Sequence, residues 1–242
     1  MLSNSCVKVD HVYKKFGNQV VLQDITLEVP KSQIFGLLGP SGSGKTTLVK
    51  LISGIDVATS GDIRLLDVSM PKLEMMNQIG YMSQSDALYM ELSAQENLEF
   101  FAALFGLNAA ARKIRIQEVM ELVDLQAFLK KSVASYSGGM KRRLSLAIAL
   151  LHKPKVLILD EPTVGIDPVL RKSIWDEFTR LSQQGTTIIV TTHVMDEADK
   201  CHRLGMIREG KLIAVGSPAE LKQQTGTNTI EEAFLYYEGV KS

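Results

Sequence analysis

Several features are scarce in this chain of 242 residues, and each scarcity excludes a class of protein. The two cysteines, Cys6 and Cys201, are isolated, so they fit neither a disulfide framework nor a Cys-x-x-Cys metal or redox motif. Basic and acidic residues are equal at 27 each, which gives no broad field for nucleic acid or anionic lipid. The sequence contains no internal repeat and no low-complexity tract.

Membrane and secretion signals are also missing from the sequence. The longest clean apolar run in a helical stretch, 144–151, is broken by Ser145 and is far too short to span a bilayer. The first five residues lack the basic-then-apolar order of a signal peptide. We therefore expect a soluble protein that is not secreted, has no transmembrane segment and does not bind nucleic acid.

The strongest positive signal is the stretch 39–47, which fits the pattern G-x-x-x-x-G-K-[ST]. An apolar run at 34–38 precedes it as a buried strand, and the apolar residues that follow mark the core face of a helix. Such a setting suits a phosphate-binding loop, because its glycines let backbone N–H groups curl around phosphates at the positive end of a helix dipole. A Gly/Ser turn before an ordinary helix is the alternative. The expected nucleotide-binding residues are Gly39, Pro40, Ser41, Gly42, Ser43, Gly44, Lys45, Thr46 and Thr47.

The rest of the chain alternates strands and helices, which predicts an α/β fold. Period-2 apolar positions in 5–29 predict a small antiparallel sheet with a turn. Apolar runs predict buried strands at 79–83, 156–159, 186–192 and 204–207 and a hairpin strand at 212–215.

Helices are predicted from caps and from apolar periodicity. The helical stretch 93–130 begins with a capping box of Ser93 and Glu96. Asp167 before Pro168 is a strong helix start, and short helices are expected at 195–201 and in the tail. The first helix after Ser93 is expected to bury Leu98, Phe101, Ala102 and Phe105.

Polar residues with catalytic potential follow three of the predicted strands. Asp160 and Glu161 come at the carboxyl end of a strand, where open α/β sheets bind ligands. Asp160 and the Thr46 hydroxyl would hold Mg²⁺, and Glu161 would activate the water that attacks the γ-phosphate. His193 could reach the same phosphate, and Gln84 could touch Mg²⁺ or the water. A solvated acid pair, a structural histidine and a surface glutamine are the alternatives.

Two further sites carry less specific signals. Ser137, Gly138 and Gly139 stand at the start of a predicted helix, where bare N–H groups and a positive dipole end could bind a second anion. An ordinary N-cap turn is the alternative there. Tyr13 and Phe16 flank the first turn, and either ring could stack on a nucleotide base or cover the sheet.

Together these residues resemble the motifs of the nucleotide-binding subunit of an ABC transporter, in the order in which that family carries them. The match covers about residues 5 to 237, and six motifs in register are far more specific than one phosphate loop. The similar stretches are 39–47 (Walker A), Gln84 (Q-loop), 137–140 (signature), 159–162 (Walker B, with Glu161 as its catalytic glutamate), 165–167 (D-loop) and His193 (switch histidine). Phe16 falls where the family has its base-stacking aromatic, and Tyr13 is the weaker candidate.

The resemblance implies a P-loop NTPase fold with a mostly parallel central sheet, an antiparallel β subdomain and a helical insertion. A single ATPase domain would span 1–242, with the core and β subdomain at about 1–84 and 155–242 and the helical subdomain at about 85–154. Family members bind ATP with Mg²⁺, and two subunits pack head to tail. Each ATP then lies between the Walker A of one subunit and the signature of the other, here Ser137, Gly138, Gly139 and Met140, with Asp167 nearby.

The family also implies an integral membrane partner. A permease subunit would dock near 84–105, where Leu88, Tyr89, Met90 and Leu92 form either a docking surface or part of the core. The chain would act at the cytoplasmic face of the membrane, attached through the permease. The wording of 136–140, followed by Lys141-Arg142-Arg143, resembles exporters of drugs, antibiotics or lipids and favours export over import.

Three residues depart from the family pattern. Met140 replaces the usual Gln of the signature, Tyr136 replaces a frequent Leu before it, and Val164 replaces a common Ser of the D-loop. Two other classes remain alternatives. A non-transport ABC ATPase normally carries two cassettes or a long coiled-coil insertion, and this sequence shows neither. A kinase or small GTPase leaves 137–140 and His193 unexplained.

Overall fold

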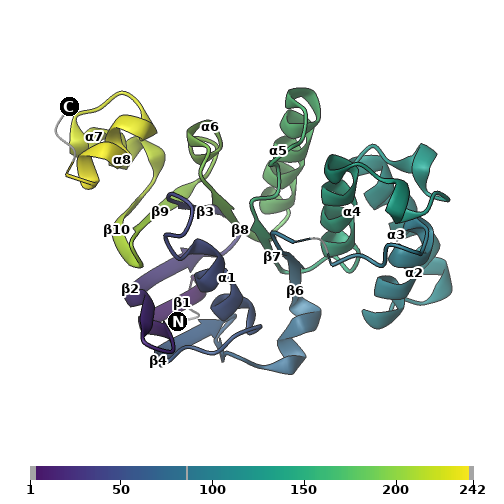
Figure 1. Cartoon of the computed structure of the whole chain (residues 1–242), viewed down its shortest axis with the longest axis horizontal. Helices are drawn as coiled ribbons and strands as arrows, with labels where there is room; N and C mark the ends of the chain where they lie inside the picture. Colours follow the sequence, from purple (N-terminus) through teal and green to yellow (C-terminus); the bar gives the residue numbers. More distant parts are fainter. Residues whose placement is uncertain (1–3, 86, 240–242) are drawn as a thin grey trace.

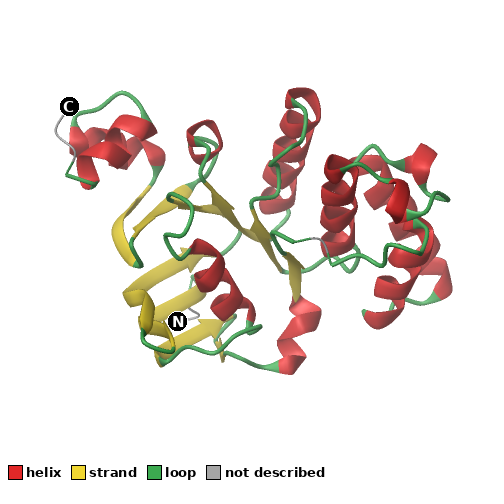
Figure 2. Ribbon diagram, viewed as in Figure 1, coloured by secondary structure: helices red, strands yellow, loops and turns green. Residues whose placement is uncertain are grey.

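The molecule is built around a six-stranded sheet with the strand order β10-β9-β3-β8-β7-β6 (Figures 1 and 2). The structure is a computed structural model that describes residues 4–85 and 87–239. Five neighbouring strands run parallel, and β10 pairs antiparallel with β9 at one edge. The strands are β3 (Ile34–Leu38), β6 (Ile79–Met82), β7 (Val156–Asp160), β8 (Thr187–Thr192), β9 (Arg203–Arg208) and β10 (Lys211–Gly216).

A second, antiparallel sheet has the order β2-β1-β4-β5. It contains β1 (Ser5–Phe16), β2 (Gln19–Pro30), β4 (Ser60–Leu65) and β5 (Val68–Ser69). Helix α1 (Lys45–Ser53) lies between the two sheets, and its Leu48, Val49, Leu51 and Ile52 share one core with β1, β2 and one face of the central sheet (Figure 1). The antiparallel sheet predicted from period-2 positions is confirmed.

The other face of the central sheet is covered by helices. Leu157 and Leu159 of β7 point into this second core, whereas Val156 and Ile158 belong to the first, as strand alternation requires. The helices are α2 (Ala94–Leu104), α3 (Ala109–Leu122), α4 (Gly138–Leu150), α5 (Pro168–Gln183), α6 (Met195–Ala198), α7 (Pro218–Thr225) and α8 (Ile230–Tyr237). Short 3-10 helices lie at η1 (Leu73–Gln78), η2 (Gln126–Phe128) and η3 (Val133–Ser135).

Three helices, α2, α3 and α4, gather beyond β6 and are called the helical region below (Figure 1). Each of these helices begins directly after a residue whose polar side chain caps it. Ser93 caps α2 with the full capping box, Asn108 caps α3, and Ser137 caps α4. Asp167 caps α5 with Pro168 in its first turn, which confirms the expected helix start. The helical insertion between β6 and β7 is therefore confirmed as a set of separate, capped helices.

Some details differ from the sequence-based expectations. Phe101 and Phe105 are only partly buried; Phe105 is the C-cap that follows α2, and its ring stacks on His152 with the ring centroids 3.8 Å apart. Helix α6 ends at Ala198, because Lys200 and Cys201 donate to carbonyls only three residues back and tighten the chain into a turn. Cys6 and Cys201 are free and buried, and burial raises the pKa of both thiols. None of the described helices is long and apolar enough to cross a membrane.

Candidate nucleotide site

The loop 39–44 joins the buried strand β3 to α1 through positions that only glycine fits. A Cβ on Gly39 would lie 2.2 Å from the Ile207 carbonyl oxygen, and a Cβ on Gly44 would lie 2.6 Å from the Leu22 side chain. Gly44 precedes α1 at φ 107°, with no side-chain cap for the helix. The first turn of α1 thus presents backbone N–H groups, which have no intrahelical partners, toward the loop.

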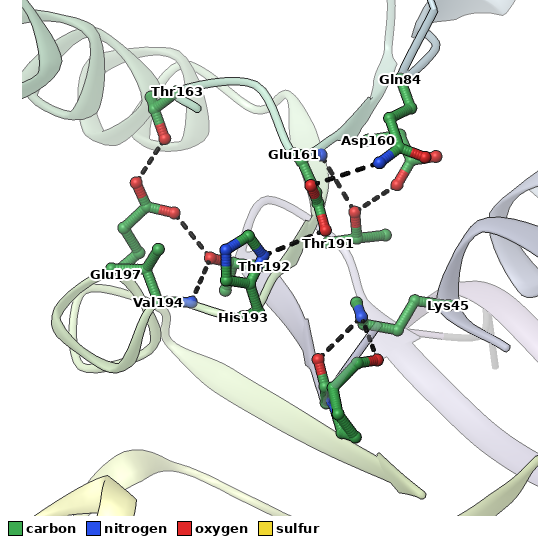
Figure 3. A network of polar contacts seen from close by, with 12 residues as sticks. Lys45, Gln84, Asp160, Glu161, Thr163, Thr191, Thr192, His193, Val194 and Glu197 are labelled. Atoms are coloured by element: carbon green, nitrogen blue, oxygen red, sulfur yellow. Dashed lines mark hydrogen bonds and ion pairs between the residues drawn. The ribbon is translucent and has the colours of Figure 1, made fainter. Parts of the chain in front are cut away.

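Lys45 stands at the start of α1 with 5% of its surface exposed. Its ammonium donates to the carbonyl oxygens of Gly39 (2.7 Å) and Pro40 (2.9 Å), so it lies across the mouth of its own loop (Figure 3). Burial lowers the pKa of Lys45, and the carboxylates of Glu161 and Asp160 oppose that shift.

Asp160 ends β7 and is fully buried. Its Oδ1 accepts a hydrogen bond from the Thr191 hydroxyl, while Oδ2 is buried without a partner. A buried carboxylate oxygen without a donor is costly unless it serves a cation or a water that holds one. The Ser43 hydroxyl in the loop is likewise buried and unpartnered. The unpartnered oxygen of Asp160 fits the expected role of this residue beside a magnesium ion bound with a nucleotide.

Glu161 brings three of the predicted site residues together. Its Oε1 lies 3.1 Å from His193 Nδ1, and its Oε2 accepts a 3.5 Å contact from Gln84 Nε2 (Figure 3). Glu161 adopts φ 51°, a left-handed conformation that a side chain rarely takes. Its backbone N–H donates to the Thr191 carbonyl (3.2 Å) and hydroxyl (3.0 Å), which holds this conformation in place. Such strain is typical of functional sites.

The stretch 137–140 lies elsewhere in the molecule. Ser137 caps α4 by accepting from the Met140 N–H at 3.2 Å, so the N-cap interpretation is correct. Ser137 and Gly138 are exposed, and no atom lies within 4 Å of a Cβ placed on Gly138. Helix α4 packs on the face of the central sheet opposite to α1. The exposed helix start remains open to an anion brought by another molecule.

Comparison with known proteins decides the family. The family model described as "ABC transporter" matches residues 22–164. The chain belongs to this family. It is 39% identical over 240 residues to the linearmycin resistance ATP-binding protein LnrL of Bacillus subtilis (strain 168), covering 95% of this chain and 77% of that protein.

Two other relatives show the same level of similarity. The probable multidrug ABC transporter ATP-binding protein YbhF of Escherichia coli (strain K12) is 37% identical over 236 residues, covering 95% of this chain and 41% of that protein. The chain thus spans less than half the length of YbhF. The daunorubicin resistance ATP-binding protein DrrA3 of Streptomyces coeruleorubidus is 38% identical over 233 residues, with 95% and 74% coverage.

Solved structures agree with this family assignment. An ATP-binding subunit of an ABC transporter superposes with a TM-score of 0.90 at 25% identity, over 97% of this chain and 100% of that one. The ATP-binding cassette MJ0796, in a dimeric post-hydrolysis state bound to ADP and Pi, gives a TM-score of 0.81 at 25% identity, over 87% and 98%. The expected P-loop NTPase fold is confirmed.

Among the remaining predicted motifs, the segment expected to be the D-loop lies beside the one expected to be the signature. A Cβ on Gly139 would lie 3.1 Å from the Gly165 carbonyl oxygen. Asp167 uses its Oδ1 to accept from the Val169 (3.1 Å) and Leu170 (3.0 Å) N–H groups, so its carboxylate serves α5 in this structure. Val164 is 47% exposed. The signature and D-loop therefore form one surface.

Phe16 is the better placed of the two aromatic candidates. Its ring is 52% exposed at the end of β1, while Tyr13 is half-buried within the strand. The Lys14 ammonium lies 4.6 Å from the Phe16 centroid and is held by Asp56 at 2.6 Å. A cation on one face and an exposed ring suit stacking of a base on the other face.

Several site residues were not found from the sequence. Thr191 holds both Asp160 and Glu161, and the buried Glu197 accepts from the hydroxyls of Thr163 and of Thr192, the residue before His193 (Figure 3). Glu197 was visible only as an acid in the first turn of a short helix, a pattern explained by the helix dipole alone. The buried guanidinium of Arg142 was likewise missed and is described below.

Proposed function

We propose that this chain is the ATP-binding and ATP-hydrolysing subunit of an ABC transporter, and that it powers export of a drug, antibiotic or lipid-like substrate. The observation that carries hydrolysis is the Glu161 carboxylate, held between His193 and Gln84 at the carboxyl ends of parallel strands. The observation that supports export is the wording of 136–140, together with relatives named for multidrug, linearmycin and daunorubicin resistance.

In the proposed reaction, ATP lies over the loop 39–47 with its phosphates on the first turn of α1. When ATP binds, the Lys45 ammonium leaves the carbonyl oxygens of Gly39 and Pro40 and binds the phosphates instead. Thr46, Gln84 and Asp160, the last through water, would hold Mg²⁺, which neutralises charge on the β- and γ-phosphates when bound.

Glu161 polarises the attacking water in this proposal. A hydrogen bond from His193 Nδ1 to Glu161 Oε1 fixes the imidazole, and a ring that is protonated on Nε2 as well would donate from Nε2 to a γ-phosphate oxygen. Gln84 fixes the second carboxylate oxygen from the other side. The Thr191 contacts fix the main chain of Glu161, and His193 and Gln84 contact its carboxylate before ATP arrives, so little reorganisation is needed.

A second subunit would complete each site. Ser137 and Gly138 are exposed, Gly139 and Met140 are partly buried, and Gly165 of the proposed D-loop, two residues before Asp167, adjoins Gly139. In a head-to-tail dimer, identical or with a paralogue, this surface covers the nucleotide bound to the other chain. ATP then closes the dimer, and hydrolysis reopens it. The core at about 1–84 and 155–242 would bind the nucleotide, and the part at about 85–154 would present the signature.

The permease is proposed to dock on the segment 84–105. Leu88 and Met90 pack against the core, which leaves Tyr89, Phe100 and Leu104 as the exposed apolar side chains, at 46, 45 and 67%. The Tyr89 and Phe100 rings meet edge to face with centroids 5.0 Å apart, so they form one rigid patch. Docking there would hold the chain at the cytoplasmic face of the membrane.

Glu161→Gln tests the proposed activity. We expect unchanged ATP binding, a turnover lower by about 10²–10⁴-fold because the base is lost, and an ATP-trapped dimer on size-exclusion chromatography. Glu209→Gln is the matched control, since Glu209 also has a left-handed φ (46°) but lies in the β9–β10 turn. Equal ATPase rates in the wild type and Glu161→Gln would refute the proposed activity.

A further inference from the structure

Arg142 joins the helical region to the catalytic strands. It belongs to α4, two residues after Met140, and only 8% of its surface is exposed. Its Nη1 donates to the carbonyl oxygens of Ser83 (2.9 Å) and Gln84 (2.8 Å), and its Nη2 donates to those of Asp160 and Glu161. One side chain thus binds the main chain of Gln84 and Glu161, two of the proposed site residues.

The chemistry of the group explains this arrangement. The last paired residues of β6 and β7 are Met82 and Leu159. The residues that follow them on each side therefore have no partner on the other strand. Their carbonyl groups need donors when buried. A planar guanidinium offers five N–H donors in a fixed fork, whereas an ammonium is a single point charge with three. Arginine can therefore serve both strand ends at once.

The position of Arg142 along α4 gives the contact a direction. It lies five residues after Ser137, about 7 Å along the helix axis, on a helix that packs against β6 and β7 (Figure 1). The exposed start of α4 and the Arg142 side chain therefore belong to one helix and move together when it moves. A displacement of that start moves the four carbonyl contacts as well.

We propose that Arg142 is a positioning residue that couples the signature helix to Gln84 and Glu161. When the start of α4 is engaged, the guanidinium sets the main chain at both residues and hence the Glu161 carboxylate between Gln84 and His193. This inference rests on the proposed ATPase function. It means that a contact within one chain links closure of the dimer to hydrolysis of ATP.

Arg143 provides a matched control one residue along the helix. Its Nη1 donates to the carbonyl oxygens of Val123 (3.1 Å) and Asp124 (3.2 Å), both at the end of α3. It therefore makes the same kind of contact but only inside the helical region. Arg→Lys at either position removes a guanidinium that binds carbonyl oxygens. Only Arg142→Lys removes contacts with the carboxyl ends of β6 and β7.

The experiment compares Arg142→Lys and Arg143→Lys in the full chain, with ATP affinity, kcat, KM and melting temperature measured for each. We expect Arg142→Lys to lower kcat at least about tenfold with ATP affinity within about threefold, and Arg143→Lys to leave kcat within about twofold. In the Glu161→Gln background, Arg142→Lys should still form the ATP-trapped dimer, which a merely unfolded variant would not.

Two results would overturn the inference: a wild-type kcat in Arg142→Lys, or equal losses of kcat in both lysine variants. If Arg142→Lys does not fold, Arg142→Gln replaces it, because an amide retains two N–H donors and should give an intermediate kcat. A wild-type kcat there would likewise overturn it. If the wild-type chain itself fails to hydrolyse ATP, the proposed function falls; if it hydrolyses ATP and Arg142→Lys matches it, only the coupling falls.

Discussion

The chain has two glycine-containing helix starts, and the difference between them explains the design of the site. Before α1, Gly39 and Gly44 are packed so tightly that a Cβ would meet Ile207 and Leu22, and Lys45 closes over the loop. Before α4, Gly138 is exposed with open space around it. Both starts offer the same positive dipole end. The first helix start is closed by residues of its own chain, whereas the second helix start is exposed.

The largest effect is expected at the inner helix start. Lys45→Ala should abolish nucleotide binding, because the loop then has no cation to meet the phosphates. In the wild type, Mg-ATP at about 100 times its dissociation constant should add roughly 2.7 kcal/mol to the free energy of unfolding. The measurement is the melting shift with Mg-ATP. Lys50→Ala, on the exposed part of the same helix, should keep the shift.

A shift that survives in Lys45→Ala would contradict the assignment of 39–47 as the phosphate loop. Removal of Mg²⁺ with a chelator should reduce the wild-type shift, since Asp160, a proposed magnesium-binding residue, has a carboxylate oxygen that is buried without a partner.

At the outer helix start we expect a loss of activity without a loss of stability. Gly138→Asp has room for its side chain, and an acid in the first turn of α4 is favourable for the helix. The new carboxylate should repel the γ-phosphate of ATP on the other subunit and lower kcat by about 10- to 100-fold, by mutant kinetics. Melting temperature and ATP binding to the monomer should match those of Gly138→Ala.

Mixing the two inactive variants sharpens the comparison. A mixed dimer of Lys45→Ala and Gly138→Asp has one site with both changes and one with neither. Random pairing should therefore restore about a quarter of the wild-type activity in a symmetric two-site dimer. No recovery on mixing would show that both helix starts act on a nucleotide in the same chain.

A smaller effect is expected at Phe16. Phe16→Ala removes a stacking surface of about 1–3 kcal/mol, so KM for ATP should rise roughly 5- to 150-fold with kcat at saturation unchanged. Phe16→Tyr should keep the wild-type KM. Tyr13→Ala serves as the comparison from the same strand, and a larger rise in KM there would transfer the stacking role to Tyr13.

The sequence allowed much of this arrangement to be predicted, for local reasons. The loop 39–47, the capping box at Ser93 and the strand ending at Asp160 each depend on residues close together in the chain, so a pattern reveals them. The contacts of Arg142 with Gln84 and Glu161 and of Thr163 with Glu197 join distant segments. In the sequence, Arg142 contributed only to the resemblance of the basic run 141–143 to exporters, and no periodicity marks a buried guanidinium.

The smallest effect separates the two roles of Ser137. Ser93 and Ser137 cap α2 and α4 in the same way, each accepting from the N–H three residues on, at 3.2 Å. Replacing either with alanine should lower stability by about 1 kcal/mol, a fall in melting temperature of roughly 2–4 °C for a chain of this size. Only Ser137→Ala should also lower kcat, because its hydroxyl lies at the exposed start that would meet the second nucleotide. Equal kcat values in the two variants would leave Ser137 as a cap alone and reduce the outer site to the backbone N–H groups of Gly138 and Gly139.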